Sequence, residues 1–109
     1  MQILGPIKDL LDDLKRRLTV AYGHRLDAVV LFGSEARGDA RAESDIDILV
    51  VLRGPIDDYG LELDRSLTAV YPVALRVGRR ISVKPVDRRD YEQGNCPLLR
   101  EVRRTGVAA

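Results

Sequence analysis

Residues 33–47 read GSEARGDARAESDID and lie between two apolar segments, AVVLF and ILVVL. Continuous apolar runs of this length are typical of strands that are covered on both faces of a sheet. We therefore expect buried strands at Ala28–Phe32 and Ile46–Leu52, joined by a loop over residues 33–44 that is rich in small and charged side chains.

Two longer segments have the amphipathic pattern of helices. Over residues 3–22, apolar side chains recur at helical spacing, and charged side chains including Asp13 occupy the other face. A second helix is expected after an Asp57 or Asp58 cap. Pro72 lies inside its pattern, so we expect the helix to kink or break there. The apolar face of this helix consists of Tyr59, Leu63, Leu67, Val70, Ala74 and Val77.

The C-terminal part of the chain predicts one more strand and further helical segments. Residues 81–86 form the strand, and Pro85 favours an edge position or the end of the strand because it cannot donate to the ladder. A short helical turn over residues 87–93 and an amphipathic helix over residues 98–104, ended by Gly106, complete the pattern. We therefore predict an α/β fold in which helices cover both faces of a small sheet.

The length and composition indicate a single domain over residues 1–109. The net charge of +1, from 18 basic and 17 acidic side chains, argues against a general nucleic-acid-binding protein. No apolar run approaches the roughly 20 residues that span a bilayer, and the single Cys96 excludes an internal disulfide. We expect a cytoplasmic protein with no membrane contact, for which nucleic acid is not a direct ligand.

The loop after the first strand contains the groups that nucleotidyl transfer requires. Asp45 and Asp47 lie two residues apart at an expected strand, so both side chains leave the same face and can hold Mg²⁺. Gly33 lets the backbone approach a phosphate without a Cβ clash, and Ser34 offers a hydroxyl. Arg37 in the same loop can neutralise an outgoing pyrophosphate.

Each of these features alone has an ordinary structural explanation. Asp-x-Asp pairs are common, a Gly-Ser pair after a strand is usually only a turn, and loop arginines are usually solvated. The combination of a strand, Gly-Ser, a gap of ten residues and Asp-x-Asp at a second buried strand is much more specific. We therefore predict Asp45 and Asp47 as catalytic and metal-binding residues, and assign nucleotide and phosphate binding to Gly33, Ser34 and Arg37.

At these residues the chain resembles a minimal nucleotidyltransferase of the polymerase-β superfamily. The family signature, Gly-Ser followed after ten residues by Asp-x-Asp, falls on Gly33, Ser34, Asp45 and Asp47. The fuller text GSEARGDA and SDIDILVV and the tail CPLLREVRRTGV are also similar to bacterial members, so the resemblance covers nearly the whole chain. It implies a nucleotidyltransferase fold with a mixed sheet, Mg²⁺ as cofactor, and a nucleoside triphosphate, usually ATP, as donor.

The resemblance also implies a protein partner. Small proteins of this kind often pair with a HEPN-type (higher eukaryotes and prokaryotes nucleotide-binding) protein, a toxic ribonuclease whose antitoxin is the nucleotidyltransferase. Some members silence the toxin by transferring AMP to it, typically onto a tyrosine hydroxyl. We expect such a partner here, and leave open whether the chain forms a homodimer.

The chain departs from the family pattern on the third strand, where the family places a third carboxylate as metal ligand and general base. Here the strand reads ISVKPVD, with Ser82 or Lys84 at the equivalent position. Asp87 and Asp90 lie just beyond, and act either as substitutes for the missing carboxylate or as turn and helix-cap residues. The nearby arginines are expected to lie on a solvated face: Arg76, Arg79 and Arg80.

Two main functions stay open from the sequence. One is an enzyme that transfers AMP to a hydroxyl of a partner protein, with activity reduced or lost through the missing carboxylate. The other is a binding module that keeps the fold and neutralises a partner by stoichiometric contact. A transferase acting on a small molecule such as an antibiotic is disfavoured, because it would need extra substrate-binding structure or a dimer that supplies it.

Overall fold

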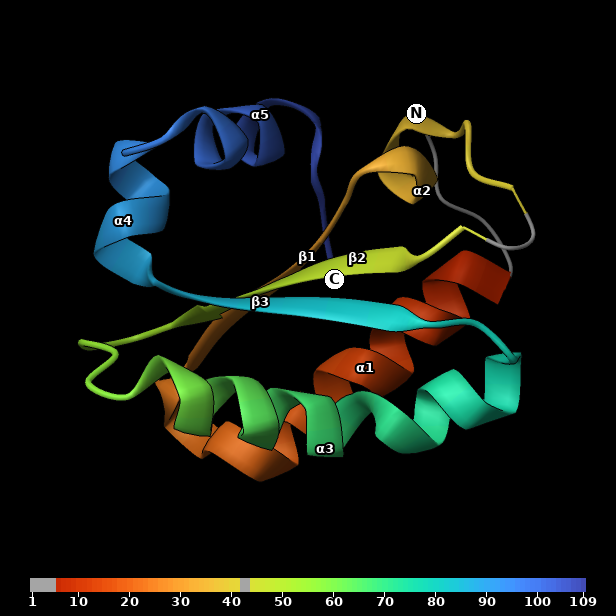
Figure 1. The fold of residues 1–109 in the computed structure, drawn as a ribbon, viewed down its shortest axis with the longest axis horizontal. Helices are drawn as coiled ribbons and strands as arrows, with labels where there is room; N and C mark the ends of the chain where they lie inside the picture. Colours follow the sequence, from red (N-terminus) through yellow and green to blue (C-terminus); the bar gives the residue numbers. More distant parts are fainter. Residues whose placement is uncertain (1–5, 42–43) are drawn as a thin grey trace.

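The computed structural model describes residues 6–41 and 44–109, which form a four-stranded sheet between helices (Figure 1). The beginning of the helix expected from residue 3 lies outside the described residues. In chain order, the elements are α1 (Pro6–Tyr22), a 3-10 turn (Gly23–Arg25), β1 (Leu26–Phe32), α2 (Ser34–Arg37), β2 (Ile46–Leu52), α3 (Tyr59–Val77), β3 (Ile81–Asp87), α4 (Arg88–Gln93), α5 (Pro97–Thr105) and β4 (Val107–Ala108).

The sheet is mixed, with the strand order β3-β2-β1-β4. Strand β1 is antiparallel to both β2 and β4, whereas β2 and β3 are parallel and connected through α3. Helices α1 and α3 cover one face of the sheet, and α4 and α5 lie over the other (Figure 1). The predicted fold, a small mixed sheet flanked by helices, is therefore confirmed.

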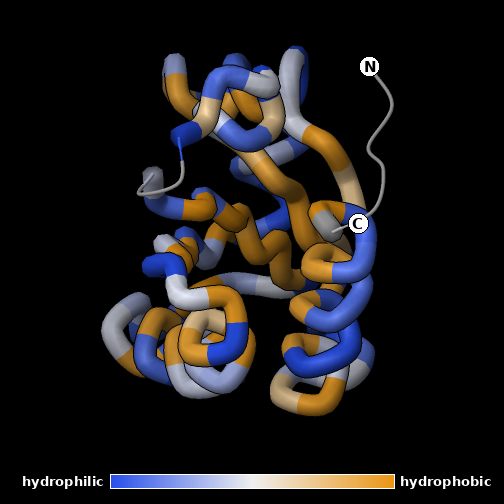
Figure 2. Tube along the Cα trace, turned by 90° about the vertical axis from the view of Figure 1, so that its right-hand side faces the viewer, coloured by the Kyte–Doolittle hydropathy of each residue, from blue (hydrophilic) through white to orange (hydrophobic). Residues whose placement is uncertain are grey.

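Two apolar clusters, one on each face of the sheet, form the core. The larger cluster joins α1 and α3 to the sheet, and the smaller one joins α5 to the other face. Side chains of β2 alternate between them: Ile48 and Val50 belong to the larger cluster, and Leu49 and Val51 to the smaller. Figure 2 shows the resulting concentration of hydrophobic segments in the strands between the helical layers. This alternation fixes the face on which each β2 side chain lies.

One edge strand of the sheet was predicted from the sequence, and the other was not. Strand β3 is an edge strand, which confirms the position expected from Pro85. The other edge, β4, has only two residues and was not predicted. It pairs with β1, and the amide of Ala109 continues the ladder by donating to the carbonyl of Val29 at 2.9 Å. A strand this short depends on where α5 delivers the chain, which no local pattern encodes.

Helix α3 differs from its predicted form in two respects. It runs without a break from Tyr59 to Val77, so of the kink or break expected at Pro72 the break is wrong. Pro72 has no amide hydrogen, so the carbonyl of Thr68 lacks its helical hydrogen bond. Both residues are exposed, and water can bind that carbonyl instead. Tyr59 and Leu67, assigned to the apolar face, are 46% and 42% exposed. The buried face instead begins with polar side chains, because the hydroxyl of Tyr22 packs there.

Helix α1 buries its predicted apolar stripe but also one carboxylate. Asp13, expected on the solvated face, is only 7% exposed and forms ion pairs with Arg16, Arg17 and Arg76. Burial alone would raise the pKa of Asp13, but the three arginines together hold it below its ordinary value. Within residues 6–41 and 44–109, no helix is both long and apolar enough to cross a membrane.

Candidate nucleotide-binding site

The two aspartates lie where the chain enters β2. Asp47 is the second residue of the strand, and its register partners are Phe32 on β1 and Ser82 on β3. Its neighbours Ile46 and Ile48 point into the core under α1 and α3. Because side chains alternate along a strand, Asp47 lies on the opposite face of the sheet. Asp45 directly precedes the strand and is partly exposed.

Gly33 packs directly against the Asp47 carboxylate. It ends β1 with a φ of +73°, a conformation that side-chain-bearing residues rarely adopt. A Cβ atom at this position would overlap Oδ2 of Asp47 and lie 3.3 Å from its Cγ. The glycine is therefore required twice, once for the backbone turn and once for the space beside the carboxylate. This contact brings the Gly-Ser pair and the Asp-x-Asp pair together.

The turn after Gly33 is a single short helical segment, α2. It is closed by hydrogen bonds from the amide of Arg37 to the carbonyl of Gly33 at 3.1 Å and from the amide of Asp39 to the carbonyl of Ser34 at 3.0 Å. The sequence predicted only a loop here. Ser34 thus begins a turn whose first amides have no partner within the helix, beside the aspartate pair.

Asp47 is influenced by its burial and by two charged side chains of the site. Burial raises the pKa of Asp47 above its ordinary value, and the neighbouring Asp45 carboxylate raises it further. The charge of Arg37 opposes both effects, so this arginine also lies near Asp47. Arg37 forms an exposed ion pair with Asp39 at 3.5 Å. The structure thus gathers Gly33, Arg37, Asp45 and Asp47, with Ser34 next to Gly33.

This set of donor atoms suits a hard divalent cation. Two carboxylates whose charges repel each other gain from a cation between them, and Mg²⁺ usually takes only one or two protein carboxylates. Asp45 also forms an ion pair with the exposed guanidinium of Arg80, at 3.8 Å. Asp45 and Asp47 are the residues that would hold Mg²⁺.

The third strand does not add a carboxylate to this pair. Ser82 lies in register with Asp47, and Lys84 with Leu49, so both occupy the same face as Asp47. In the described part of the chain, no group of three or more histidine, cysteine, aspartate or glutamate side chains is placed to bind a metal. The β3 side chain next to Asp47 is thus the neutral hydroxyl of Ser82.

Asp87, the last residue of β3, and Asp90 in α4 have structural roles. Asp87 caps α4 by accepting a hydrogen bond from the amide of Arg89 at 2.8 Å. Asp90 accepts a hydrogen bond from the side-chain amide of Asn95 at 2.9 Å. The structure therefore favours roles as turn and helix-cap residues for Asp87 and Asp90 over roles as substitute metal ligands.

Arg79 is a residue of this region that the sequence analysis misjudged. It was expected on a solvated face, but its side chain is only 20% exposed and forms an ion pair with Glu35 of α2. It also donates two hydrogen bonds to the carbonyl of Ser44, at 3.1 and 2.8 Å. One signal in the sequence pointed to a buried arginine in this region. Glu35 directly follows the Gly-Ser pair, and a buried glutamate needs a basic partner.

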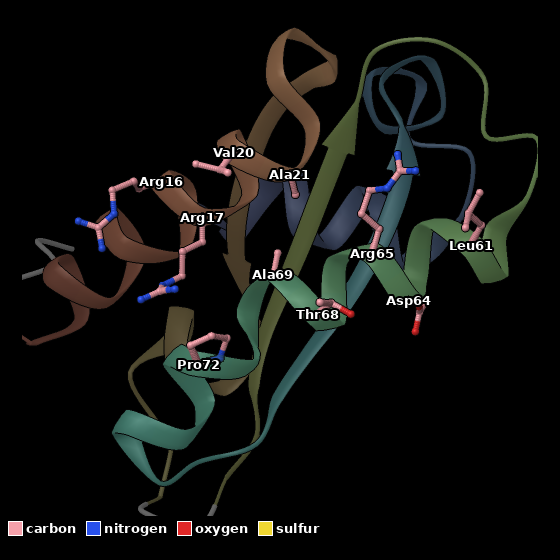
Figure 3. Close-up of a pocket in the computed structure, with 10 residues that line it drawn as sticks. All are labelled: Arg16, Arg17, Val20, Ala21, Leu61, Asp64, Arg65, Thr68, Ala69 and Pro72. Atoms are coloured by element: carbon pink, nitrogen blue, oxygen red, sulfur yellow. The ribbon is translucent and has the colours of Figure 1, made fainter.

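A groove of about 780 Å³ between α1 and α3 lies on the other side of the sheet from Asp47 (Figure 3). Val20 and Ala21 line it from α1, and Leu61 and Ala69 from α3. Its charged lining consists of three arginines and one aspartate. Because it offers no pair of carboxylates for a divalent cation and the sheet separates it from Asp47, we do not include it in the nucleotide site.

Comparisons with known proteins identify a relative of this chain. Over 70 residues the chain is 43% identical to MJ0604 of Methanocaldococcus jannaschii, named as a candidate protein adenylyltransferase; the match covers 63% of this chain and 64% of that protein. The chain thus spans slightly less than two thirds of this relative.

Two solved structures share the fold. A chain in the crystal structure of a toxin–antitoxin with AMP-PNP superposes with a TM-score of 0.61 at 22% identity, covering 89% of this chain and 69% of that one. A chain in a mutant of the toxin–antitoxin MntA–HpeT superposes with a TM-score of 0.58 at 20% identity, covering 99% of this chain and 72% of that one. At these identities the likeness concerns the fold alone.

The family assignment comes from the sequence profile described as the nucleotidyltransferase domain, which matches residues 7–94. That range contains the Gly33–Ser34 turn, both aspartates and the three strands β1, β2 and β3 that position them. Since the match covers most of the chain and includes the whole candidate site, the chain belongs to the nucleotidyltransferase domain family.

Proposed function

We propose that this domain transfers AMP from ATP to a hydroxyl group of a partner protein, using Mg²⁺ held by Asp45 and Asp47. The observation that carries the proposal is the contact of Gly33 with the Asp47 carboxylate, which sets the Gly33–Ser34 turn beside two carboxylates. The relative MJ0604, named as a candidate protein adenylyltransferase, supports AMP and a protein acceptor.

Each residue of the site has a distinct part in this proposal. Asp45 and Asp47 bind the cation, which supplies charge neutralisation for the triphosphate and the leaving pyrophosphate. Gly33 and Ser34 receive a phosphate through backbone amides and the serine hydroxyl. Arg37, whose charge already acts on Asp47, offsets the negative charge that develops on the pyrophosphate.

The reaction is an in-line displacement at the α-phosphorus. The acceptor oxygen forms a bond to the α-phosphorus while the bond from that phosphorus to the bridging oxygen of pyrophosphate breaks. The acceptor proton passes to solvent, and we assign no residue of this chain as its base. Because Ser82 replaces a carboxylate beside Asp47, we expect transfer to be slower than with a complete set of three carboxylates.

The partner in this proposal is a HEPN-type toxin, and the domain is its antitoxin. The family resemblance suggests the pairing, and the fold is shared with chains from two toxin–antitoxin structures. The acceptor is then a hydroxyl of the toxin, typically that of a tyrosine. AMP on that residue would add negative charge and bulk where the toxin acts, which accounts for neutralisation.

The direct test is label transfer from ATP carrying ³²P at the α-phosphorus. The purified domain, Mg²⁺ and the protein encoded by the adjacent gene are mixed, and label on that protein is measured. We expect labelling that depends on Mg²⁺ and is lost in Asp45→Asn and Asp47→Asn. An absence of label with the wild-type domain, or equal label with both variants, would contradict enzymatic transfer.

One observation favours a second function. The serine beside Asp47 leaves the site with two carboxylates, which is compatible with a domain that neutralises its partner by contact alone. In that case, Asp45→Asn and Asp47→Asn would form the complex and inhibit the partner as well as wild type does. Loss of inhibition in both variants, with the complex still formed, would exclude this alternative.

A further inference from the structure

The side chain of Arg79 lies between the two halves of the candidate site. Helix α3 ends at Val77, Gly78 turns the chain with a φ of +68°, and β3 begins at Ile81. Arg79 therefore sits at the connection from the helical layer back to the sheet, beside the entry to β2. The carbonyl of its neighbour Arg80 accepts a hydrogen bond from the amide of Ile46 at 2.9 Å, which fixes this connection to β2.

The guanidinium of Arg79 binds both ends of the loop that carries the motif. Its Nη1 forms an ion pair with the carboxylate of Glu35, and its Nε and Nη2 donate to the carbonyl of Ser44 at 3.1 and 2.8 Å. The carboxylate partner is well covered, since the side chain of Glu35 is only 11% exposed. A single planar group thus joins α2 to the residue before β2.

The two anchoring points are adjacent to the proposed ligands. Glu35 directly follows Ser34, and Ser44 directly precedes Asp45. Between them, Gly38, Asp39 and Arg41 are exposed. A change in the distance from α2 to Ser44 would therefore move Ser34 relative to Asp45.

We infer that Arg79 is a positioning residue, which holds Ser34 and Asp45 in place on either side of the Gly33–Asp47 contact. This inference rests on the proposed function, because it assigns the loop geometry to the binding of one Mg²⁺·ATP. Glu35 neutralises the guanidinium, so Arg79 fixes the loop without competing with the cation for Asp45 and Asp47.

The arrangement requires arginine rather than any cation. The donors of arginine form a rigid planar fork, so it can bind a carboxylate on one side and a carbonyl on the other at the same time. Lysine presents one compact ammonium group on a flexible stem and cannot hold both partners in one plane. Arg79→Lys therefore keeps the charge but not the positioning.

The test compares Arg79→Ala and Arg79→Lys with Arg16→Ala. Arg16 is an exposed arginine on the other side of the sheet, and its partner Asp13 keeps Arg17 and Arg76. Label transfer at varied ATP concentration gives kcat and KM, Mn²⁺ titration followed by electron paramagnetic resonance gives cation affinity, and thermal unfolding reports the fold.

We expect both Arg79 variants to lose about 10- to 100-fold in kcat or in Mn²⁺·ATP affinity, as when a residue that orients metal ligands is removed. Arg16→Ala should match wild type in both measurements. If Arg79→Ala proves too unstable, Glu35→Gln keeps the side-chain shape and should show a smaller loss in the same direction. Wild-type kcat and Mn²⁺·ATP affinity in folded Arg79→Ala would overturn the inference.

The two proposals fail in different ways. If wild type transfers no label but binds Mn²⁺·ATP, the proposed transfer falls, and a weaker affinity in Arg79→Ala still supports positioning. If wild type transfers label and folded Arg79→Ala does so equally well, positioning falls and the transfer stands. If wild type binds no Mn²⁺·ATP, both fall.

Discussion

Ser82 lies directly beside Asp47 in the parallel register of β3 and β2, on the same face of the sheet. The family resemblance places a third carboxylate on this strand, and the register places a neutral hydroxyl, that of Ser82, next to Asp47. The carboxylates at the end of the strand and after it have other roles, since Asp87 caps α4 and Asp90 accepts a hydrogen bond from Asn95. One side chain therefore separates this site from a three-carboxylate site.

The first prediction concerns Ser82→Asp, which adds the absent carboxylate. We expect Mn²⁺ to bind about tenfold more tightly, which corresponds to about 1.4 kcal/mol, and label transfer to accelerate. Without a cation, three neighbouring carboxylates repel one another, so the variant should unfold at a lower temperature than wild type. Added Mg²⁺ should raise its melting temperature more than that of wild type.

Ser82→Asn is the matched control, because it has nearly the same shape as aspartate and no charge. It should bind Mn²⁺ no more tightly than wild type. If Ser82→Asp also leaves Mn²⁺ affinity and label transfer unchanged, the side chain at this position does not reach the cation.

The second prediction compares Gly33→Ala with Gly54→Ala. Both glycines have positive φ, +73° and +86°, so alanine is strained at both. Only at Gly33 would the new Cβ collide with Asp47; at Gly54 no described atom lies within 4 Å beyond its chain neighbours. We expect both variants to lose about 1 kcal/mol or more of unfolding free energy, and only Gly33→Ala to lose Mn²⁺·ATP binding. Equal binding in the two variants would show that the Gly33–Asp47 contact is not needed.

The third prediction is the pH dependence of stability from Asp13. Its pKa is lowered in the folded state, so its contribution to stability is present above the unfolded aspartate pKa and is lost as the pH falls through the folded value. Asp13→Asn should lower the unfolding free energy at pH 7 by about 1 kcal/mol, because the partner arginines are partly exposed.

Urea unfolding at a series of pH values checks this prediction. The difference between wild type and Asp13→Asn should shrink as the pH falls below 4, the range in which aspartates protonate. Asp12→Asn removes an exposed carboxylate that pairs with the exposed Lys8, and should change little at any pH. A constant difference between wild type and Asp13→Asn across the pH series would exclude the ion-pair explanation.

The fourth prediction concerns Pro72 in α3. Alanine at this exposed position restores an amide that can donate to the carbonyl of Thr68, so Pro72→Ala should stabilise the protein by about 1–3 kcal/mol. Label transfer should be unchanged, because α3 covers the face of the sheet opposite Asp47. Thermal unfolding measures the gain, and a lower melting temperature would mean that the proline ring packs usefully in the α1–α3 groove.

The sequence predicted β1, β2 and β3, and pointed to the candidate site between them, because both depend on local patterns. The apolar runs of β1 and β2 and the spacing from Gly33 to Asp47 are visible without coordinates, and Pro85 correctly marked an edge strand. The contact of Gly33 with Asp47 follows once β1 and β2 pair as neighbours, since Phe32 and Asp47 are register partners.

The charged residues were harder to place, because their burial depends on partners distant in sequence. Asp13 is stabilised in part by Arg76 of another helix, and Arg79 binds Glu35 and Ser44 across the fold. A list of charges cannot separate such pairs from a solvated face. For the same reason, the sequence alone could not tell whether Ser82 or Lys84 lies next to Asp47. The β2–β3 register pairs Asp47 with Ser82 and Leu49 with Lys84.

The central claim, that Asp45 and Asp47 bind a divalent cation beside the Gly33 turn, is tested most directly by Mn²⁺ titration with ATP. Electron paramagnetic resonance measures free Mn²⁺ for wild type, Asp47→Asn and the exposed control Asp12→Asn. We predict Mn²⁺·ATP binding by wild type and Asp12→Asn, weakened at least about tenfold in Asp47→Asn. Equal affinity in all three proteins, or no binding by wild type, would contradict the claim.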